Sequence, residues 1–463
     1  MMPMAAATIA AIYLTGTWLA GVCLAVLFAG WHLLRPDGAP PVLRLAFLYQ
    51  WSQVSVGVFY MGLTGRELEA LDSDYERMVL LGLGCMLALA VGIRLGIVWM
   101  ARLRPEIEPP IEEAVSFRTL LIAYAAGIVV TGAVQQLAWS FPAFTQAIIA
   151  LTFSRLALLF LIVRRLTTPV LQGHAIAVLM TLEVLLGFTG YFANFREPLI
   201  VIGIALLEGF DRRRASHWMT AATIAAVLGA SGLLWMSVRK EYRQDYDDDL
   251  FAASRATRLE RIHDLATAWF TDDGRDLATN TDDLVNRHWA IYYPALAVAR
   301  VPGVLPHTDG EILFGALRHM VTPRVLFPDK PELPSDSEMV RKYSGVYVAG
   351  AEHNTSIAFG YVAESYLDFG MPVMFVPVFL YAVLIGCAYQ WFLLAIRHRE
   401  LAVGLVTVVF WLGLYLFERS WIKTLGIDVT LMVYLGGLTF LLDRFLLLRR
   451  EAELPEDLSV QSL

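Results

Sequence analysis

Residues 78–100 read MVLLGLGCMLALAVGIRLGIVWM, an apolar run with a single charged residue, Arg94. A helix of about 20 apolar residues crosses the hydrocarbon core of a bilayer, which is ~30 Å thick. In hydrocarbon every backbone amide and carbonyl needs an internal partner, and a helix supplies these partners within one segment. The run therefore predicts a transmembrane helix.

Similar runs recur along the chain. Its 463 residues are 57% hydrophobic and 17% charged, whereas soluble proteins carry roughly 25% charged residues. The composition thus predicts an all-α polytopic membrane protein with about eleven transmembrane helices. One predicted span, at 197–210, is short enough to be tilted, broken or re-entrant. The predicted spans are 8–33, 43–64, 78–100, 117–139, 143–163, 174–192, 197–210, 217–238, 371–396, 401–420 and 426–447.

Basic residues in the short connections predict the orientation, because cytoplasmic loops are enriched in lysine and arginine. Every second connection is basic, as at 102–104, 164–165 and 397–399, and the alternate ones are acidic or nearly uncharged. This pattern places the N-terminus on the periplasmic side and the C-terminus in the cytoplasm.

One hydrophilic segment, at 239–355, then lies outside the cytoplasm. Loops longer than about 15 residues are usually functional or disordered. Trp289, Phe314 and other apolar residues favour an ordered, mostly helical loop. His288 lies on a helix expected at 281–299 and is interpreted as a surface or packing residue. The chain divides into an N-terminal bundle (1–238), the large periplasmic loop (239–355), C-terminal transmembrane helices (356–448) and a cytoplasmic tail (449–463).

Composition and motifs argue against several functions. The net charge of −7 argues against a nucleic-acid partner. The sequence has no P-loop, G-x-G-x-x-G fingerprint or kinase signature, so no nucleotide cofactor is expected. Cys23, Cys85 and Cys387 all lie in predicted spans, and no Cys/His cluster suggests a metal site. We therefore expect neither a cofactor nor a metal.

The first candidate site residue is Arg196, in the FREP stretch at 195–198. It lies at the predicted outer junction of the sixth and seventh spans. An arginine there could bind a phosphate through two parallel hydrogen bonds. The alternative is an interfacial arginine paired with Glu197.

The stretch TPRVLFPDKPELPSDS at 322–337 contains four prolines, which forbid a continuous helix. Basic residues in this part of the loop, including Arg324 and Arg341, are candidates for binding a diphosphate. The alternative is a solvated surface charge, which the sequence favours for Lys330 and Arg341 but not for Arg324.

Three residues are candidates for acid–base chemistry. Glu364 lies one helical turn before Asp368 in NTSIAFGYVAESYLDFG at 354–370, and paired carboxylates near a low-dielectric boundary can act as acid or base. His319 and His353 flank the proline-rich stretch and the return to the membrane, and either could be a base near neutral pH. Alternatively, Glu364 pairs with a basic loop residue and each histidine is structural.

These stretches and their order resemble the Wzy-type polymerases of bacterial surface polysaccharides, which form one membrane superfamily with the O-antigen ligases. Residues 322–337 are similar to the family's IPR-x-hydrophobic-W/F-P-x-K-P stretch. Residues 354–370 are similar to its T-x-x-x-G-Y-x-x-E-x-Y-x-x-F-G stretch, which leads into a span. FREP occupies the place of a G-x-R turn, with Phe195 instead of a small residue.

The resemblance implies polymerisation of lipid-diphosphate-linked repeat units at the periplasmic face of a bacterial inner membrane. Undecaprenyl-diphosphate-linked oligosaccharides would be donor and acceptor, and a chain-length regulator and a flippase would be further partners. Arg196 and Arg324 would stabilise the departing diphosphate. Glu364, His319 or His353 would deprotonate the acceptor hydroxyl.

Three other interpretations stay open. An O-antigen ligase-like transferase would differ only in its acceptor. A lipid-linked glycan flippase or other transporter would carry its charges near the membrane midplane, whereas here the charges gather at the predicted outer face. An assembly or sensing subunit would use the loop as a docking module.

Overall fold

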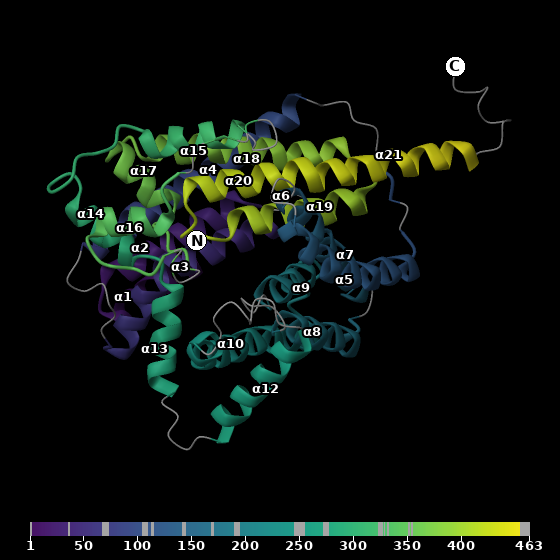
Figure 1. The fold of residues 1–463 in the computed structure, drawn as a ribbon, viewed down its shortest axis with the longest axis horizontal. Helices are drawn as coiled ribbons and strands as arrows, with labels where there is room; N and C mark the ends of the chain where they lie inside the picture. Colours follow the sequence, from purple (N-terminus) through teal and green to yellow (C-terminus); the bar gives the residue numbers. More distant parts are fainter. Residues whose placement is uncertain are drawn as a thin grey trace.

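The computed structural model describes residues 2–35, 38–66, 74–103, 110–112, 115–140, 145–167, 171–188, 195–244, 255–271, 277–322, 327, 329–330, 333–350, 352 and 355–453. These residues form helices and no β-strand, apart from one isolated bridge between Ile111 and His398. The predicted all-α class is confirmed (Figure 1). The helices are α1 (Met2–Thr15), α2 (Trp18–Leu33), α3 (Val42–Thr64), α4 (Tyr75–Leu103), α5 (Phe117–Ser140), α6 (Thr145–Thr152), α7 (Ser154–Thr167), α8 (Gly173–Phe188), α9 (Arg196–Glu208), α10 (Ala215–Gln244), α12 (Arg255–Thr271), α13 (Leu277–His288), α14 (Tyr292–Arg300), α15 (Glu311–Val321), α16 (Asp336–Ser344), α17 (Tyr361–Phe369), α18 (Phe375–Ala395), α19 (Arg399–Leu414), α20 (Trp421–Thr430), the π-helix η3 (Leu431–Leu435) and α21 (Gly436–Glu453).

Within the described residues, five helical segments are long and apolar enough to cross a membrane, judged by length and composition. Shorter apolar helices accompany them, among them α2 and α8. The chain is therefore a membrane protein, as predicted. The five segments are Tyr75–Leu103, Gln146–Thr167, Ala215–Val238, Phe375–Ala395 and Trp421–Leu448.

Helices α4 and α18 pack along one another, and glycines make the close approach possible. A Cβ atom on Gly84 would lie 2.9 Å from the ring of Phe375, and one on Gly96 would lie 2.8 Å from the backbone nitrogen of Cys387. Both contacts advance in the same direction along the two helices, so α4 and α18 are parallel. Small residues of this kind bring the backbones of membrane helices together.

We expect Gly386→Val to destabilise this pair. A Cβ atom at Gly386 would lie 2.1 Å from the carbonyl oxygen of Ile93, so the two backbones would have to separate. Overpacking typically costs about 1–3 kcal/mol. The measurement is the melting temperature in detergent, with Gly437→Val as the control because nothing lies within 4 Å of a Cβ there. Equal losses in both variants would contradict the close packing.

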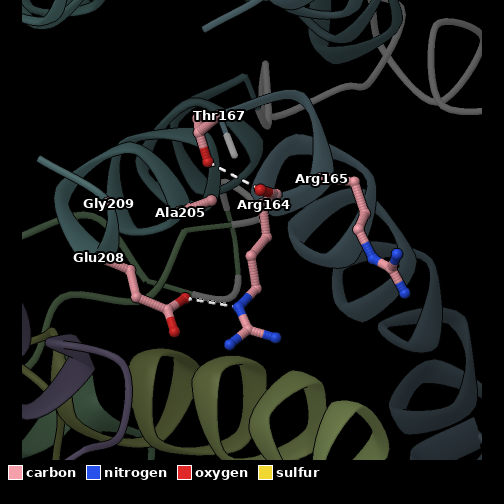
Figure 2. Close-up of a pocket in the computed structure, with 6 residues that line it drawn as sticks. All are labelled: Arg164, Arg165, Thr167, Ala205, Glu208 and Gly209. Carbon is pink, nitrogen blue, oxygen red and sulfur yellow. Dashed lines mark hydrogen bonds and ion pairs between the residues drawn. The ribbon is translucent and has the colours of Figure 1, made fainter. Parts of the chain in front are cut away.

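Helices α7 and α9 also pack against each other, and their C-terminal ends lie together. Arg164 on α7 donates from Nε to Glu208 on α9 at 3.0 Å. A pocket of about 350 Å³ lies at this end of the pair, lined by Arg164, Arg165, Thr167, Ala205, Glu208 and Gly209 (Figure 2). The other end of α9 begins at Arg196.

Candidate functional site

The candidate site lies where α9 begins, α13 ends and α19 gives way to α20, against the middle of α3. The predicted helix at 281–299 is divided in two, because the backbone nitrogen of Ala290 donates to the Gln53 carbonyl of α3 at 3.0 Å. The Trp289 indole donates to the Val54 carbonyl at 3.0 Å. These two hydrogen bonds fix the C-terminal end of α13, and therefore His288, on α3.

The turn between α19 and α20 is held on α3 by two buried glutamines. The Gln50 amide donates to the carbonyl of Leu414, the last residue of α19. The backbone nitrogen of Phe417 donates to Gln53 Oε1 at 2.8 Å. Gln50 and Gln53 are only 1% and 2% exposed, so loss of either would leave buried polar groups unpaired.

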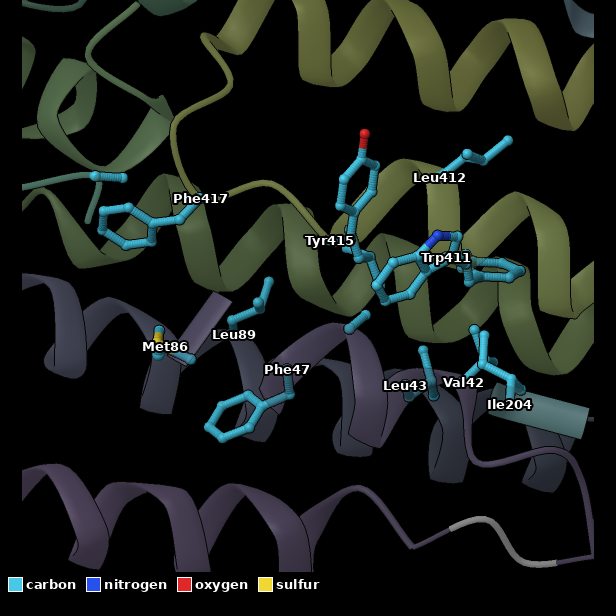
Figure 3. Close-up of a cluster of buried hydrophobic side chains, with 14 of the residues drawn as sticks. Val42, Leu43, Phe47, Met86, Leu89, Ile204, Trp411, Leu412, Tyr415 and Phe417 are labelled. Atoms are coloured by element: carbon cyan, nitrogen blue, oxygen red, sulfur yellow. The ribbon is translucent and has the colours of Figure 1, made fainter. Parts of the chain in front are cut away.

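Apolar packing next to the site joins α3, α4, α9 and α19 (Figure 3). The aromatic ring of Trp411 stacks on Tyr415 with ring centroids 4.9 Å apart. This core fixes the helix ends that carry the polar residues. Its labelled members are Val42, Leu43, Phe47, Met86, Leu89, Ile204, Trp411, Leu412, Tyr415 and Phe417.

Arg196 is at the centre of the site. Its guanidinium donates to Tyr49 Oη at 3.2 Å, to Glu197 Oε1 at 3.0 Å and to Tyr415 Oη at 3.1 Å. It also lies over both tyrosine rings, 5.8 Å and 5.1 Å from their centroids. These bonds use three of the five N–H donors of an arginine, and the side chain is 38% exposed. Arg196 is therefore held in place but remains accessible to a ligand.

A second arginine faces the turn. Arg287 donates to both carboxylate oxygens of Glu418, at 2.8 Å and 3.2 Å. Proximity of the Glu418 carboxylate raises the pKa of Arg287 above its usual value. This fork-to-carboxylate geometry ties α13 to the turn between α19 and α20.

His288 lies between the two arginines and α3. Its Nε2 is 2.8 Å from Ser52 Oγ, and its ring meets Tyr49 edge-on with centroids 5.2 Å apart. The Ser52 hydroxyl donates to the Tyr49 carbonyl at 2.7 Å. The imidazole must then donate from Nε2 to Ser52, which leaves Nδ1 with its lone pair.

The charge state of His288 follows from its surroundings. Burial, and then the positive charge of Arg196, lower the pKa of His288 to about 4. The imidazole is therefore neutral at neutral pH. A neutral imidazole with a lone pair at Nδ1 can accept a proton.

Arg419 completes the group. It donates to the carbonyls of Leu412 and Gly413 at 2.8 Å and 2.9 Å, at the end of α19. Three arginines and two glutamates leave the group with one net positive charge when His288 is neutral. We call it the Arg196 cluster, and its members are Tyr49, Arg196, Glu197, Arg287, His288, Tyr415, Glu418 and Arg419.

Glu364, expected as a catalytic residue, lies on α17, and its side chain contacts the start of α20. It is 4% exposed and accepts a hydrogen bond from the backbone nitrogen of Trp421 at 2.7 Å. Burial raises the pKa of Glu364 to about 8. Its neighbour Asp368 accepts from the backbone nitrogens of Ile312 and Leu313 at 3.0 Å and 2.8 Å. The two carboxylates thus cap two different helices, which favours a structural role for Glu364.

We expect Glu364→Ala to lower the free energy of unfolding by about 1–3 kcal/mol, because the buried Trp421 amide loses its acceptor. Glu364→Gln keeps an acceptor oxygen and should retain the fold and activity.

Folded wild-type protein keeps the Glu364 proton up to about pH 8, whereas the unfolded chain releases it near pH 4.5. Wild-type stability should therefore fall as the pH rises between these values, and the glutamine variant should show less of this fall. Melting temperatures of the wild type and of Glu364→Gln, measured between pH 4.5 and pH 8, test this pH dependence. A large loss of activity in Glu364→Gln would instead support a catalytic role for Glu364.

Arg341, expected to bind diphosphate, is engaged with its own loop. It donates to the Val348 carbonyl at 2.8 Å, pairs with Glu352 and lies 4.6 Å over the ring of Tyr347. His319 lies on α15, where its backbone carbonyl accepts from Lys330 Nζ at 2.5 Å. The structure does not bring Arg341 together with the Arg196 cluster through any contact among the described residues.

Arg324 and His353 lie outside the described residues. Of the sequence-based candidates, the structure thus places Arg196 in the cluster. The residues that sequence reasoning assigned otherwise, or did not single out, are Tyr49, Arg287, His288 and Tyr415.

Comparison with known proteins gives one family. A family model described as a domain of unknown function (DUF8712) matches residues 72–394. The match includes Arg196, Arg287 and His288. No curated protein and no solved structure matches the chain. Since the family model covers more than half of the sequence, the chain belongs to the DUF8712 family.

Proposed function

We propose that the protein polymerises lipid-diphosphate-linked oligosaccharide repeat units into a surface polysaccharide, at the periplasmic face of a bacterial inner membrane. The observation that carries this proposal is the Arg196 cluster, in which an arginine with spare donors lies beside a neutral histidine. These are the groups that a diphosphate leaving group and an attacking hydroxyl require. The lipid-linked sugar substrate comes from the resemblance of residues 322–337 and 354–370 to the polymerases.

The proposal includes about eleven spans, with the N-terminus periplasmic, the C-terminus cytoplasmic and a large periplasmic loop at 239–355. Two observations support this orientation. Helices α4 and α18 are parallel, as they must be if both run from the periplasm to the cytoplasm. The C-terminal ends of α7 and α9 also lie together, at the end of α9 opposite Arg196, as they must if both helices run toward the cytoplasm.

The lengths of the helices support a recessed site. α9 has 13 residues, which corresponds to a length of about 20 Å, less than the ~30 Å hydrocarbon core. The turn between α19 and α20 is likewise non-helical backbone, and in the proposed topology it lies close to membrane depth. Such backbone is tolerated where it is buried in protein or lines a water-filled cavity. A recessed polar site suits a diphosphate that is attached to a membrane-embedded lipid.

In the proposed reaction, Arg196 binds the donor diphosphate with its spare donors. The bond between the anomeric carbon and the diphosphate oxygen breaks, and Arg196 with the Tyr49 hydroxyl stabilises the negative charge that develops. The Tyr415 hydroxyl donates to Glu197 Oε1 at 3.1 Å and helps to position Arg196. The acceptor hydroxyl oxygen forms the new bond to the anomeric carbon, and its proton passes to His288 Nδ1. Polyprenyl diphosphate is released.

The charges of the cluster couple binding to base strength. Without substrate, burial and Arg196 keep the pKa of His288 low. A bound diphosphate neutralises the positive charge of Arg196 and Arg287, which raises the proton affinity of the imidazole. His288 thereby becomes a stronger base when the leaving group is in place.

A lipid-linked glycan flippase is the second candidate. Short α9 and the interrupted α19–α20 segment resemble the discontinuous helices that form transporter binding sites near the midplane. A flippase would use Arg196 to bind the diphosphate but would not need the base at His288. A ligase-like transferase would use the same chemistry with another acceptor.

The test is deletion of the gene, followed by separation of the surface polysaccharide from the lipid-linked pool. We expect long chains to disappear and single repeat units to remain on the periplasmic lipid carrier. Loss of a flippase would instead leave the repeat units on the cytoplasmic side. Persistence of normal long chains in the deletion strain would refute the polymerase proposal.

A further inference from the structure

The pocket at the end of α7 and α9 opposite the Arg196 cluster has no role in the proposed reaction. It measures about 350 Å³ and is lined by two arginines, Arg164 and Arg165, and one acid, Glu208. Arg165 is paired with Glu400, which its Nε contacts at 3.0 Å. The six lining residues, with two arginines and one glutamate, carry one net positive charge. Glu400 lies outside this lining.

Arg164 is positioned to bind a further group. Its Nε donates to Glu208 at 3.0 Å, and the structure gives no partner for its terminal nitrogens among the described residues. Its side chain is 28% exposed. The Thr167 hydroxyl donates to the Arg164 backbone carbonyl at 2.8 Å and so satisfies one of the carbonyls at the end of α7 (Figure 2). That carbonyl is then less able to repel an anion.

Two neighbouring features indicate a membrane–water interface at this pocket. The next turn adds three arginines and one aspartate at 211–214, of which Arg214 pairs with Asp211 at 3.2 Å. Trp218 is 56% exposed and donates from its indole to the Arg212 carbonyl at 3.1 Å. Tryptophan with one polar and one apolar side is enriched at membrane interfaces. Exposed Leu207 supplies apolar surface on α9.

We propose that this pocket binds the phosphate group of an anionic membrane lipid. Basic pockets between membrane helices bind lipid head groups, and an arginine binds phosphate oxygens through parallel N–H donors. The pocket volume lies within the ~300–1,000 Å³ range of small-molecule sites. This assignment is independent of the reaction proposed for the Arg196 cluster.

The experiment uses the full-length protein in nanodiscs of phosphatidylcholine, with or without phosphatidylglycerol. We expect phosphatidylglycerol to raise the melting temperature by a few degrees, because a ligand that binds only the folded state stabilises it. The double variant Arg164→Gln/Glu208→Gln removes the arginine without leaving its carboxylate unpaired, and it should lose most of this shift. Arg444→Gln, which removes an exposed charge on α21, is the matched control and should keep the shift.

Two outcomes would overturn the assignment. One is an equal phosphatidylglycerol shift in the wild type and the double variant. The other is an equal shift when inorganic phosphate is added to phosphatidylcholine discs, which would make a soluble phosphate the ligand. A count of retained phosphatidylglycerol by native mass spectrometry provides a second measurement, in which the double variant should retain one lipid fewer.

Discussion

Arg196→Lys is expected to lower the rate of polymer formation by roughly 100- to 1,000-fold, the range for loss of one donor that stabilises a developing negative charge. Lysine keeps the positive charge opposite Glu197, so the carboxylate is not left unpaired. It loses the planar fork that contacts Tyr49, Tyr415 and a diphosphate together. Binding and stabilisation of the leaving group should therefore fail while the fold persists.

The measurement is the rate at which membranes containing equal amounts of each variant extend a lipid-linked repeat unit. Arg341→Lys is the matched control, because Arg341 is an arginine that, among the described residues, donates to Val348 and Glu352 and lies over the ring of Tyr347. It should retain nearly full activity. Normal activity in Arg196→Lys, or an equal loss in Arg341→Lys, would contradict the assignment of the diphosphate site.

His288→Gln is expected to lower kcat by about 10²- to 10⁴-fold, the usual contribution of a general base. A glutamine amide can still donate to Ser52, so the packing of α13 on α3 should be retained. Its oxygen cannot hold a proton at any relevant pH. His263→Gln, an exposed histidine on α12, is the matched control and should leave kcat unchanged.

The pH profile distinguishes a base from a packing residue. In the free protein the pKa of His288 is about 4, so kcat/KM should fall only toward that pH. The bound diphosphate raises this pKa, so kcat should begin to fall at a higher pH than kcat/KM. In His288→Gln, neither kcat/KM nor kcat should show this fall at low pH. A full kcat in His288→Gln would exclude His288 as the base.

Protonation of His288 should also lower the stability of the folded protein at acidic pH. The unfolded chain takes up this proton near pH 6.5 and the folded protein only near pH 4. The free energy of unfolding should therefore fall as the pH decreases between these values. Melting temperatures measured over the same range separate this loss from the change in kcat.

The predicted span 8–33 is divided in the structure into α1 and α2 at Gly16, which has a φ of 69°. Helix α4 was predicted well, because its local apolar run determines it. The end of α19 was not, because the predicted span 401–420 continues six residues beyond Leu414. Gln50 and Gln53 of α3 hold the turn that follows, and Arg419 binds the last carbonyls of α19. These partners come together only in the folded chain, so the local sequence could not reveal the break.

The same reason limited the prediction of the site. Arg196 was identified because a charge beside a predicted span is unusual. Glu364 was singled out by its spacing from Asp368, but that spacing does not show which helix end each carboxylate meets. His288 lies on a polar helix that looks like a surface element, and its burial depends on hydrogen bonds between 289–290 and α3. The signal that could have found it is Arg287 beside His288, immediately before a tryptophan.

The most direct test of the central claim uses the purified protein in liposomes that contain a single kind of polyprenyl-diphosphate-linked oligosaccharide. It measures whether the protein transfers one oligosaccharide onto another. The account predicts lipid-linked products that grow by whole repeat units, with one polyprenyl diphosphate released for each new linkage, and no such products with Arg196→Lys. The account would be contradicted if no new linkage formed and the substrate only crossed the bilayer or stayed unchanged.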